Sequence, residues 1–219
     1  MCPQRHSELR RKRTRNTDIV SFALLAQRIL DLPEQGTRLV AIDGGGGSGK
    51  TTFAARLAAG LGGAPIVPTD DFASAEIPID WWPRMRDQVI LPLRKGGSAR
   101  YQRYDWPTGE LAEWVEVAQC PVVIIEGVSS GRMEWASELA FLIWVEAPRR
   151  VRLASGLERD GAAARQLWLG WMAAEDRYRR LHRPNQRADL IVAGAPTGRH
   201  DLASELLQLR GVRTIEDHL

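Results

Sequence analysis

A glycine-rich segment constrains this chain more than any other part of it. The residues from Asp43 to Thr52 read Asp-Gly-Gly-Gly-Gly-Ser-Gly-Lys-Thr-Thr, which fits the pattern of a glycine, four residues of any kind, and then Gly-Lys-Thr. The segment follows an apolar stretch and precedes one with helical spacing, the context in which this pattern carries meaning. Glycines let successive N–H groups surround a phosphate, and the start of a helix adds free N–H donors and the positive end of its dipole. We therefore predict a nucleotide phosphate site formed by Gly44, Gly45, Gly46, Gly47, Ser48, Gly49, Lys50, Thr51 and Thr52.

Two side chains of this loop have predicted roles of their own. We expect Lys50 to bridge the β- and γ-phosphates of ATP and the Thr51 hydroxyl to ligate Mg²⁺. Only three lysines occur in the 219 residues, so the placement of Lys50 does not follow from a lysine-rich composition. The alternative is a plain glycine turn between a strand and a helix.

The pattern of apolar residues predicts strands that alternate with helices. Helical spacing occurs in Thr51 to Leu61, Trp82 to Arg94 and Arg149 to Arg159. The expected strands do not alternate between polar and apolar residues, which is typical of strands buried on both faces of a parallel sheet. This order predicts a doubly wound α/β fold with a five-stranded parallel sheet. The five strands are expected at Arg38 to Asp43, Ala64 to Pro68, Pro121 to Glu126, Ala140 to Glu146 and Ala188 to Ala193.

Two further elements complete the predicted architecture. Thr17 or Asp18 is expected to cap an amphipathic helix that ends before Pro33. Ala99 to Tyr104 and Glu113 to Val117 flank a Pro-Thr-Gly turn signal and predict a small antiparallel hairpin.

Charge and composition narrow the expected partners. The formal net charge is +3, but residues 1–16 alone carry +5, which leaves −2 for residues 17–219. We expect residues 1–16 to be a basic, disordered leader and residues 17–219 to form a single domain. The domain then needs no nucleic-acid partner, and the absence of a long apolar run argues against a membrane. Two cysteines provide no disulfide framework, which favours the cytoplasm.

Carboxylates at the ends of two predicted strands are candidates for the chemistry. Thr69-Asp70-Asp71-Phe72 follows the second strand, and Glu126 ends the third. The carboxyl ends of parallel strands open onto the ligand crevice, so Asp70 is placed to reach a phosphate acceptor. Glu126 is placed to hold Mg²⁺, directly or through water. The alternatives are a helix cap for the aspartates and a solvated strand end for Glu126.

From about Leu39 to Ala193 the chain resembles the uridine kinase-like group of P-loop kinases, which includes phosphoribulokinase and bacterial pantothenate kinase. The resemblance implies a three-layer α/β/α P-loop fold, with an acceptor lobe at about 73–119 and an arginine-bearing lid at about 149–183. Its marks, in order, are the glycine loop, Asp70-Asp71-Phe72, Tyr104-Asp105, Glu126-Gly127-Val128, Arg152-Leu153, Arg159-Asp160 and Ala188-Asp189-Leu190-Ile191-Val192.

The resemblance also implies roles for individual residues. Asp70 becomes the catalytic base and a further metal-site residue, while Lys50 and Arg159 assist the transfer. Arg152, Arg159 and Arg165 would close on ATP, although Arg165 is about one position out of register. Residues expected at the acceptor are Asp71, Phe72, Trp81, Tyr104 and Asp105.

Departures from the group concern mainly the acceptor. The His and Arg that follow Tyr-Asp in uridine kinases are replaced by Gly109 and Leu111, and Ser155 and Gly156 stand where two lid arginines are common. Loss of the side chains that bind the base should change which acceptor is bound, rather than only lower the affinity for a nucleoside. The expected lobe contains four tryptophans, Trp81, Trp82, Trp106 and Trp114. They either line an acceptor pocket or pack in the core of the lobe.

The sequence thus predicts an ATP- and Mg²⁺-dependent kinase that phosphorylates a hydroxyl of a small metabolite. One alternative is a true uridine or cytidine kinase, and another is an ATP-binding regulatory protein without transfer activity. Trp168 and Trp171 are expected in the core or at a contact between subunits of a homo-oligomer.

Overall fold

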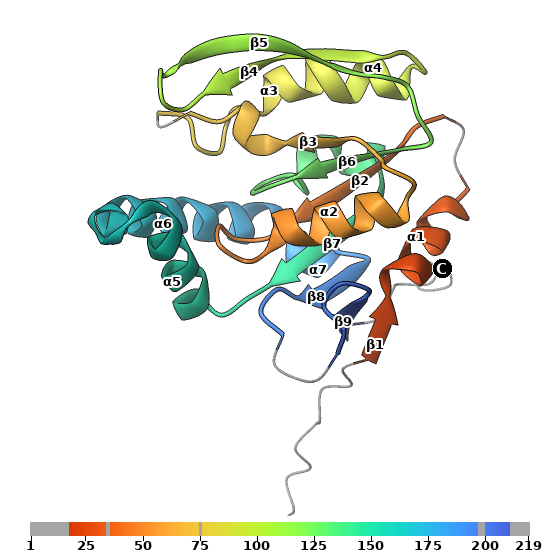
Figure 1. Ribbon diagram of the computed structural model, residues 1–219. Coiled ribbons are helices and arrows are strands. Elements are labelled where there is room, and N and C mark those ends of the chain that lie inside the picture. The colour runs from red at the N-terminus through yellow and green to blue at the C-terminus, as the bar shows by residue number, and fades with distance from the viewer. Residues whose placement is uncertain (1–17, 34–35, 75, 197–199, 211–219) are drawn as a thin grey trace, which may run out of the picture.

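A mostly parallel sheet forms the centre of the computed structural model, which describes residues 18–33, 36–74, 76–196 and 200–210 (Figure 1). Its seven strands lie in the order β1-β9-β8-β7-β2-β6-β3. The five from β8 to β3 are parallel, whereas β9 and β1 add antiparallel strands at one edge. The strands are β1 (Asp18–Ser21), β2 (Arg38–Asp43), β3 (Ile66–Pro68), β6 (Val122–Glu126), β7 (Leu139–Glu146), β8 (Leu190–Ala193) and β9 (Glu205–Arg210).

The five predicted parallel strands are confirmed, but the prediction of a helix beginning at Thr17 or Asp18 is wrong. Asp18–Ser21 is strand β1, which pairs with β9, and Ile19 is 52% exposed. The helix α1 (Phe22–Leu30) starts later, where the Ser21 hydroxyl accepts the N–H of Leu24 at 3.1 Å. Residues 18–21 pair with β9, which lies far along the chain, and this pairing is favoured here over an earlier start of the helix. The predicted leader at 1–16 lies outside the described residues.

Helices cover both faces of the sheet because successive residues of each inner strand point to opposite sides. Val40 and Ile42 of β2 pack against α1 and α2 (Lys50–Gly60) on one face, and Leu39 packs into a separate core on the other. Figure 1 shows α2 in front of the strands with α1 to the right, and α6 (Arg165–His182) extending to the left. The core that contains Leu39 is covered by residues 82–94. The fold therefore has the three layers expected.

The predicted helix at Trp82 to Arg94 forms as one rod of three segments: α3 (Trp82–Met85), η2 (Arg86–Ile90) and α4 (Leu91–Arg94). The middle segment has wider, π-type turns. Pro92 follows it, and a proline ring collides with the carbonyl four residues earlier in a regular α-helix, so the wider turns relieve this collision.

The predicted hairpin is present and longer than expected. It consists of β4 (Ala99–Asp105) and β5 (Glu110–Val117), which pair antiparallel above α3 and α4 (Figure 1). Tyr101 and Val117 pack into the same core as Met85 and Val89 of the rod, which fixes the hairpin on this lobe.

The remaining segments connect the strands. They are η1 (Thr69–Asp71), η3 (Met133–Glu138), α5 (Arg149–Asp160), η4 (Ala162–Ala164) and α7 (Pro184–Arg187). Segment η1 follows β3 and α5 follows β7, whereas η3 precedes β7 and α7 precedes β8. In Figure 1, α5 and α6 project together beside the loop that precedes α2. Within the described ranges, no helix is both long enough and apolar enough to cross a bilayer.

Candidate active site

The glycine loop joins β2 to α2 and presents the start of that helix. Gly49 is the N-cap of α2, with φ +93°, and no side chain caps the helix. The first-turn N–H groups thus have no side-chain acceptor, as an anion site requires. Gly47 has φ +71°, a left-handed conformation that favours glycine. The local sequence therefore produces a loop whose backbone has the conformation that an anion site requires.

Lys50 and Arg152 both lie against this loop. The buried Lys50 donates from Nζ to the Gly45 carbonyl at 3.0 Å. Arg152, from the first turns of α5, lies so close to Gly45 that a Cβ there would collide with its guanidinium. The structure therefore brings Arg152, which the resemblance placed in the lid, to the phosphate loop.

Thr51 and Glu126 form an oxygen pair at the end of the loop. The Thr51 hydroxyl lies 3.4 Å from both carboxylate oxygens of the buried Glu126. Burial raises the pKa of Glu126, Lys50 lowers it, and the negative charge of Asp70 raises it further. Mg²⁺ prefers oxygen ligands and keeps several waters, so one hydroxyl and one carboxylate fit this ion.

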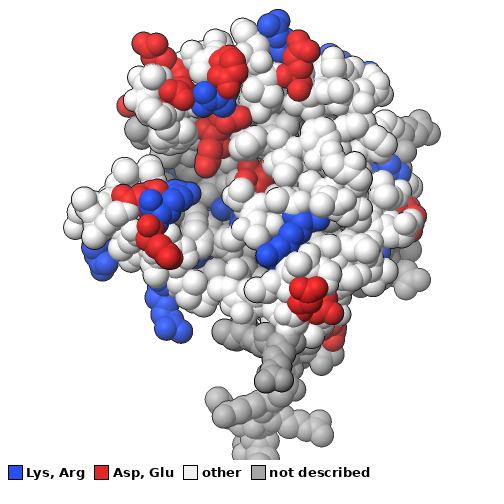
Figure 2. All heavy atoms as spheres, in the orientation of Figure 1, with Lys and Arg blue, Asp and Glu red and all other residues white. Residues whose placement is uncertain are grey.

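Asp70 and Arg159 come from two different segments, the one after β3 and the last turn of α5. Asp70 is exposed in η1, directly after β3, as the strand order predicts. Arg159, in the last turn of α5, pairs with Asp160 at 2.7 Å; this bond raises the pKa of Arg159, and Asp70 adds a smaller contribution. Figure 2 shows a hollow between the lobe and the lid, with acidic side chains on the lobe wall.

Three of the predicted acceptor residues belong to the lobe itself rather than to an open surface. Phe72 and Trp81 are buried and pack against each other with ring centroids 5.9 Å apart. Asp71 is half-buried and accepts the Tyr101 hydroxyl at 2.8 Å; burial raises the pKa of Asp71, and this hydrogen bond lowers it. Arg84 donates to the Asp71 carbonyl at 2.6 Å, which fixes the backbone beside Asp70.

Tyr104, Asp105 and Trp106 lie at the turn end of the hairpin. Asp105 accepts from Thr108 and Arg103, and these bonds lower the pKa of Asp105. Trp106 donates from Nε1 to the Asp70 carbonyl at 3.0 Å and lies edge-on to Tyr104 and to Trp171 of α6. Of the four lobe tryptophans, Trp106 is therefore the one that reaches the candidate base.

Arg165 is the site residue that the structure does not bring to the loop. It is exposed as the first residue of α6 and has no hydrogen bond or ion pair with the glycine loop, whose residues are all described. Trp168, one turn later, covers Gly46 and Gly156 instead.

Two site residues were missed by the sequence analysis, Asp43 and Glu175. Asp43 is fully buried and accepts hydrogen bonds from the N–H groups of Gly44, Ser129 and Gly131 and from the Tyr178 hydroxyl. Burial raises the pKa of Asp43, and the hydrogen bonds from Tyr178, Gly131 and Gly44 lower it. Glu175 accepts the Gly46 N–H at 2.9 Å. The only signal for Glu175 was an acidic residue at a core-facing position of the α6 pattern.

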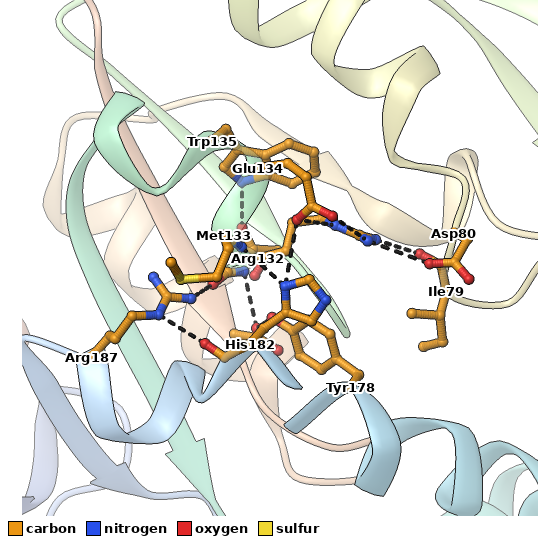
Figure 3. Close-up of polar contacts among 12 residues, drawn as sticks. Ile79, Asp80, Arg132, Met133, Glu134, Trp135, Tyr178, His182 and Arg187 are labelled. Carbon is orange, nitrogen blue, oxygen red and sulfur yellow. Dashed lines mark hydrogen bonds and ion pairs between the residues drawn. The ribbon is translucent and has the colours of Figure 1, made fainter. Parts of the chain in front are cut away.

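A second unpredicted cluster anchors the end of α6 (Figure 3). The buried Arg132 donates to the Ile79 carbonyl and to both oxygens of Glu134, and lies over the Trp82 and Trp135 rings. His182 accepts the Met133 N–H at 3.2 Å through Nδ1 and stacks on Tyr178. Its place here is structural.

A cavity of about 230 Å³ lies beside the start of α2. This is many times the roughly 10–15 Å³ that one water requires. Its lining combines the start of α2 with the segment after β8 and includes Gly49, Thr52, Phe53, Arg56, Gly194 and His200.

Comparison with known proteins supports the fold. No protein-family model and no curated protein sequence matches the chain. Among solved structures, it is similar to a possible uridine kinase from Bacillus stearothermophilus, with a TM-score of 0.60 and 22% identity over 78% of this chain and 96% of that one. It is also similar to a putative fructose transport system kinase from Silicibacter sp. TM1040, with a TM-score of 0.61 and 24% identity over 74% and 95%. The chain thus has the fold of uridine kinase-like P-loop kinases, which confirms the resemblance at the level of structure.

Proposed function

We propose that this chain transfers the γ-phosphate of ATP, in the presence of Mg²⁺, to a hydroxyl of a small metabolite. One observation carries the proposal: the glycine loop with Lys50, the Thr51 and Glu126 oxygens, and the exposed Asp70 carboxylate meet at one edge of the sheet. Phosphoryl transfer needs a phosphate cradle, a metal site and a carboxylate that handles the proton of the acceptor.

The donor would occupy both sides of the start of α2. Its phosphates would bind the loop, and its base would enter the 230 Å³ cavity lined by Thr52, Phe53 and Gly194. Thr51 and Glu126 would hold Mg²⁺, which neutralises phosphate charge when bound. Lys50 and Arg152 are the cations nearest the phosphates in this arrangement.

Asp70 would accept or orient the hydroxyl proton of the acceptor. It is exposed directly after β3, and its negative charge raises the pKa of Glu126 in addition to the larger effect of burial. Arg159 on the lid side would stabilise charge on the transferred group. Most of the catalysis would come from positioning and charge stabilisation.

Two observations bear on the alternatives. Gly109 lies in the hairpin turn with φ +72°, and Leu111 is exposed, so neither offers a polar side chain to a nucleoside base. This disfavours a uridine or cytidine kinase. Arg152 is paired with Glu175, and Ser155 and Gly156 add no charge to α5, which favours an ATP-binding protein without transfer as the second candidate.

An acceptor screen tests the proposal. The purified chain is incubated with Mg·ATP and a panel of nucleosides, pantothenate, sugars and aromatic alcohols, and acceptor-dependent ADP release is measured. We expect at least one acceptor to raise ADP release. ATP binding with no such acceptor would support the regulatory alternative.

Matched variants separate binding from transfer. Asp70→Asn should retain ATP affinity and lose turnover by about 10²–10⁴-fold, the usual contribution of a general base. Asp87→Asn, an exposed aspartate of the same lobe, should change neither. Lys50→Ala should weaken ATP binding, whereas Lys95→Ala on the lobe surface should not. Full turnover by Asp70→Asn would exclude Asp70 as the base.

A further inference from the structure

An anionic side chain of the protein itself already occupies the phosphate loop. The Glu175 carboxylate accepts the Gly46 N–H through Oε1 at 2.9 Å and pairs through Oε2 with Arg152 Nη1 at 2.8 Å. Both side chains are largely buried, with 10% of Glu175 and 12% of Arg152 exposed. A loop N–H and an arginine are the donors that a phosphate would use, so the carboxylate takes the contacts of an anionic ligand.

The space beside these contacts is small while Glu175 is in place. A cavity of about 20 Å³ remains between Gly44, Gly45, Arg152 and Glu175, which is room for about one water. A Cβ on Gly46 would come within 2.9 Å of Glu175 Oε1 and within 3.1 Å of the Trp168 ring. Because Gly46 has no side chain, the loop has room for Trp168 and Glu175 of α6.

Helix α6 holds Glu175 in this position from both sides. Trp168, Glu175, Tyr178 and His182 recur at helical spacing on one face of α6. Trp168 covers Gly46, Tyr178 donates to Asp43 at 2.6 Å, and His182 accepts from Met133 (Figure 3). The carboxylate thus lies between two sets of contacts that fix the helix on the loop.

We propose that Glu175 competes with the donor phosphates for the loop, so that nucleotide binding is an exchange of anions. The entering phosphate takes the Gly46 N–H from Glu175 and frees Arg152 to bind phosphate oxygens. Since the Gly46 N–H and Arg152 are available to a phosphate only when the carboxylate leaves, the apparent affinity for the nucleotide is lowered by the fraction of molecules in which Glu175 holds them. The inference rests on the proposed nucleotide binding, and it adds a regulatory contact to that site.

Titration calorimetry of Glu175→Gln tests the exchange, because glutamine keeps the size of the side chain and removes its charge. We expect this variant to bind Mg·ATP, and inorganic tripolyphosphate, about tenfold more tightly than the wild type. The matched control is Asp176→Asn on the same turn, since Asp176 pairs with Arg149 and Arg179 rather than with the loop. The control should bind within twofold of the wild type. Unchanged or weaker binding by Glu175→Gln overturns the proposal and assigns Glu175 to the support of Arg152.

Hydrogen exchange of the nucleotide-free protein tests the contact itself. The loop peptide that contains Gly46 should exchange faster in Glu175→Ala than in the wild type and the control, because the N–H loses its acceptor. Equal exchange in all three proteins would contradict the proposal even if Glu175→Gln changed the affinity.

These measurements separate this inference from the proposed function. Tighter binding by Glu175→Gln with no acceptor-dependent ADP release would refute the kinase and keep the exchange. Acceptor-dependent ADP release with no gain in binding would keep the kinase and refute the exchange. If ATP itself does not bind, the proposed function fails, and the tripolyphosphate titration and hydrogen exchange still test whether Glu175 competes for the loop.

Discussion

The Tyr178 hydroxyl donates a hydrogen bond to the Asp43 carboxylate, with 2.6 Å between the oxygens, and both side chains are buried. Asp43 ends the strand that leads into the glycine loop, and Tyr178 lies on α6 between Glu175 and His182. This bond ties α6 to the start of the glycine loop. Helix α6 is therefore held against the start of the loop by the protein itself, without a bound nucleotide.

Removing this hydroxyl should destabilise the protein. Tyr178→Phe leaves Asp43 with three backbone donors and deletes a buried bond to a charged group, so we expect a loss of about 1.5–3 kcal/mol in the free energy of unfolding. Urea denaturation measures it. The control is Tyr104→Phe, whose hydroxyl has no hydrogen bond among the described residues. Equal loss in both variants would contradict the assigned role.

Substitution of Arg132 should destabilise the protein more than substitution of Tyr178. Its side chain is 2% exposed and satisfies Glu134 and the Ile79 carbonyl together. Arg132→Met would leave both without their donor, and we expect a loss of about 3 kcal/mol, at the low end for a broken buried pair because Glu134 is partly exposed. Thermal unfolding is the measurement.

A surface arginine gives the comparison. Arg100 lies over the Trp114 ring and 3.9 Å from Glu116, and both partners of that ion pair are mostly exposed. Arg100→Met should change the stability by less than about 0.5 kcal/mol. A similar loss in the two variants would show that burial of Arg132 does not matter.

His182 should make the stability of the fold sensitive to acid. Burial lowers its pKa, as do Arg132 and Arg187, while Glu134 and Asp80 oppose them. The Met133 N–H bond needs an unprotonated Nδ1, which agrees with this direction and argues against a charged pair with Glu134 at 3.4 Å. With the folded pKa below its ordinary value near 6.5, the unfolded chain binds the proton more readily. Stability is therefore complete above pH 6.5 and falls as the pH drops through the folded pKa.

His182→Gln should flatten that dependence. The free energy of unfolding is measured between pH 5 and pH 8, and the difference between the wild type and the variant isolates His182 from other titrating groups. A difference that is independent of pH would mean that His182 does not titrate as described.

Trp106 should affect turnover more than stability. Its Nε1 donates to the Asp70 carbonyl, and its ring is 40% exposed. Trp106→Phe keeps a ring against Tyr104 and Trp171 but loses the bond, so kcat for the acceptor found in the screen should fall several-fold while unfolding changes little. Trp114→Phe on β5, 48% exposed, is the control. An unaltered kcat in Trp106→Phe would separate Trp106 from Asp70.

Local pattern predicted much of the site. Lys50, Thr51, Asp70 and Glu126 all stand at the carboxyl ends of parallel strands or at the helix start that follows one, so strand order alone brings them together. Arg165 shows where this reasoning stops, because a position on the lid depends on how α5 and α6 pack rather than on a strand end.

The sequence by itself determined the parallel strands, the hairpin and the glycine loop, because each depends on backbone preferences and apolar spacing within a few residues. Only the tertiary structure decided the strand at Asp18–Ser21 and the contacts of Asp43 and Glu175. Their partners lie far away in the chain: Gly46 and Glu175 are 129 residues apart, and Asp43 and Tyr178 are 135. Buried polar groups need hydrogen-bond partners, and the fold supplies these from distant parts of the chain. The spacing of residues within one segment therefore does not predict which partners they will have.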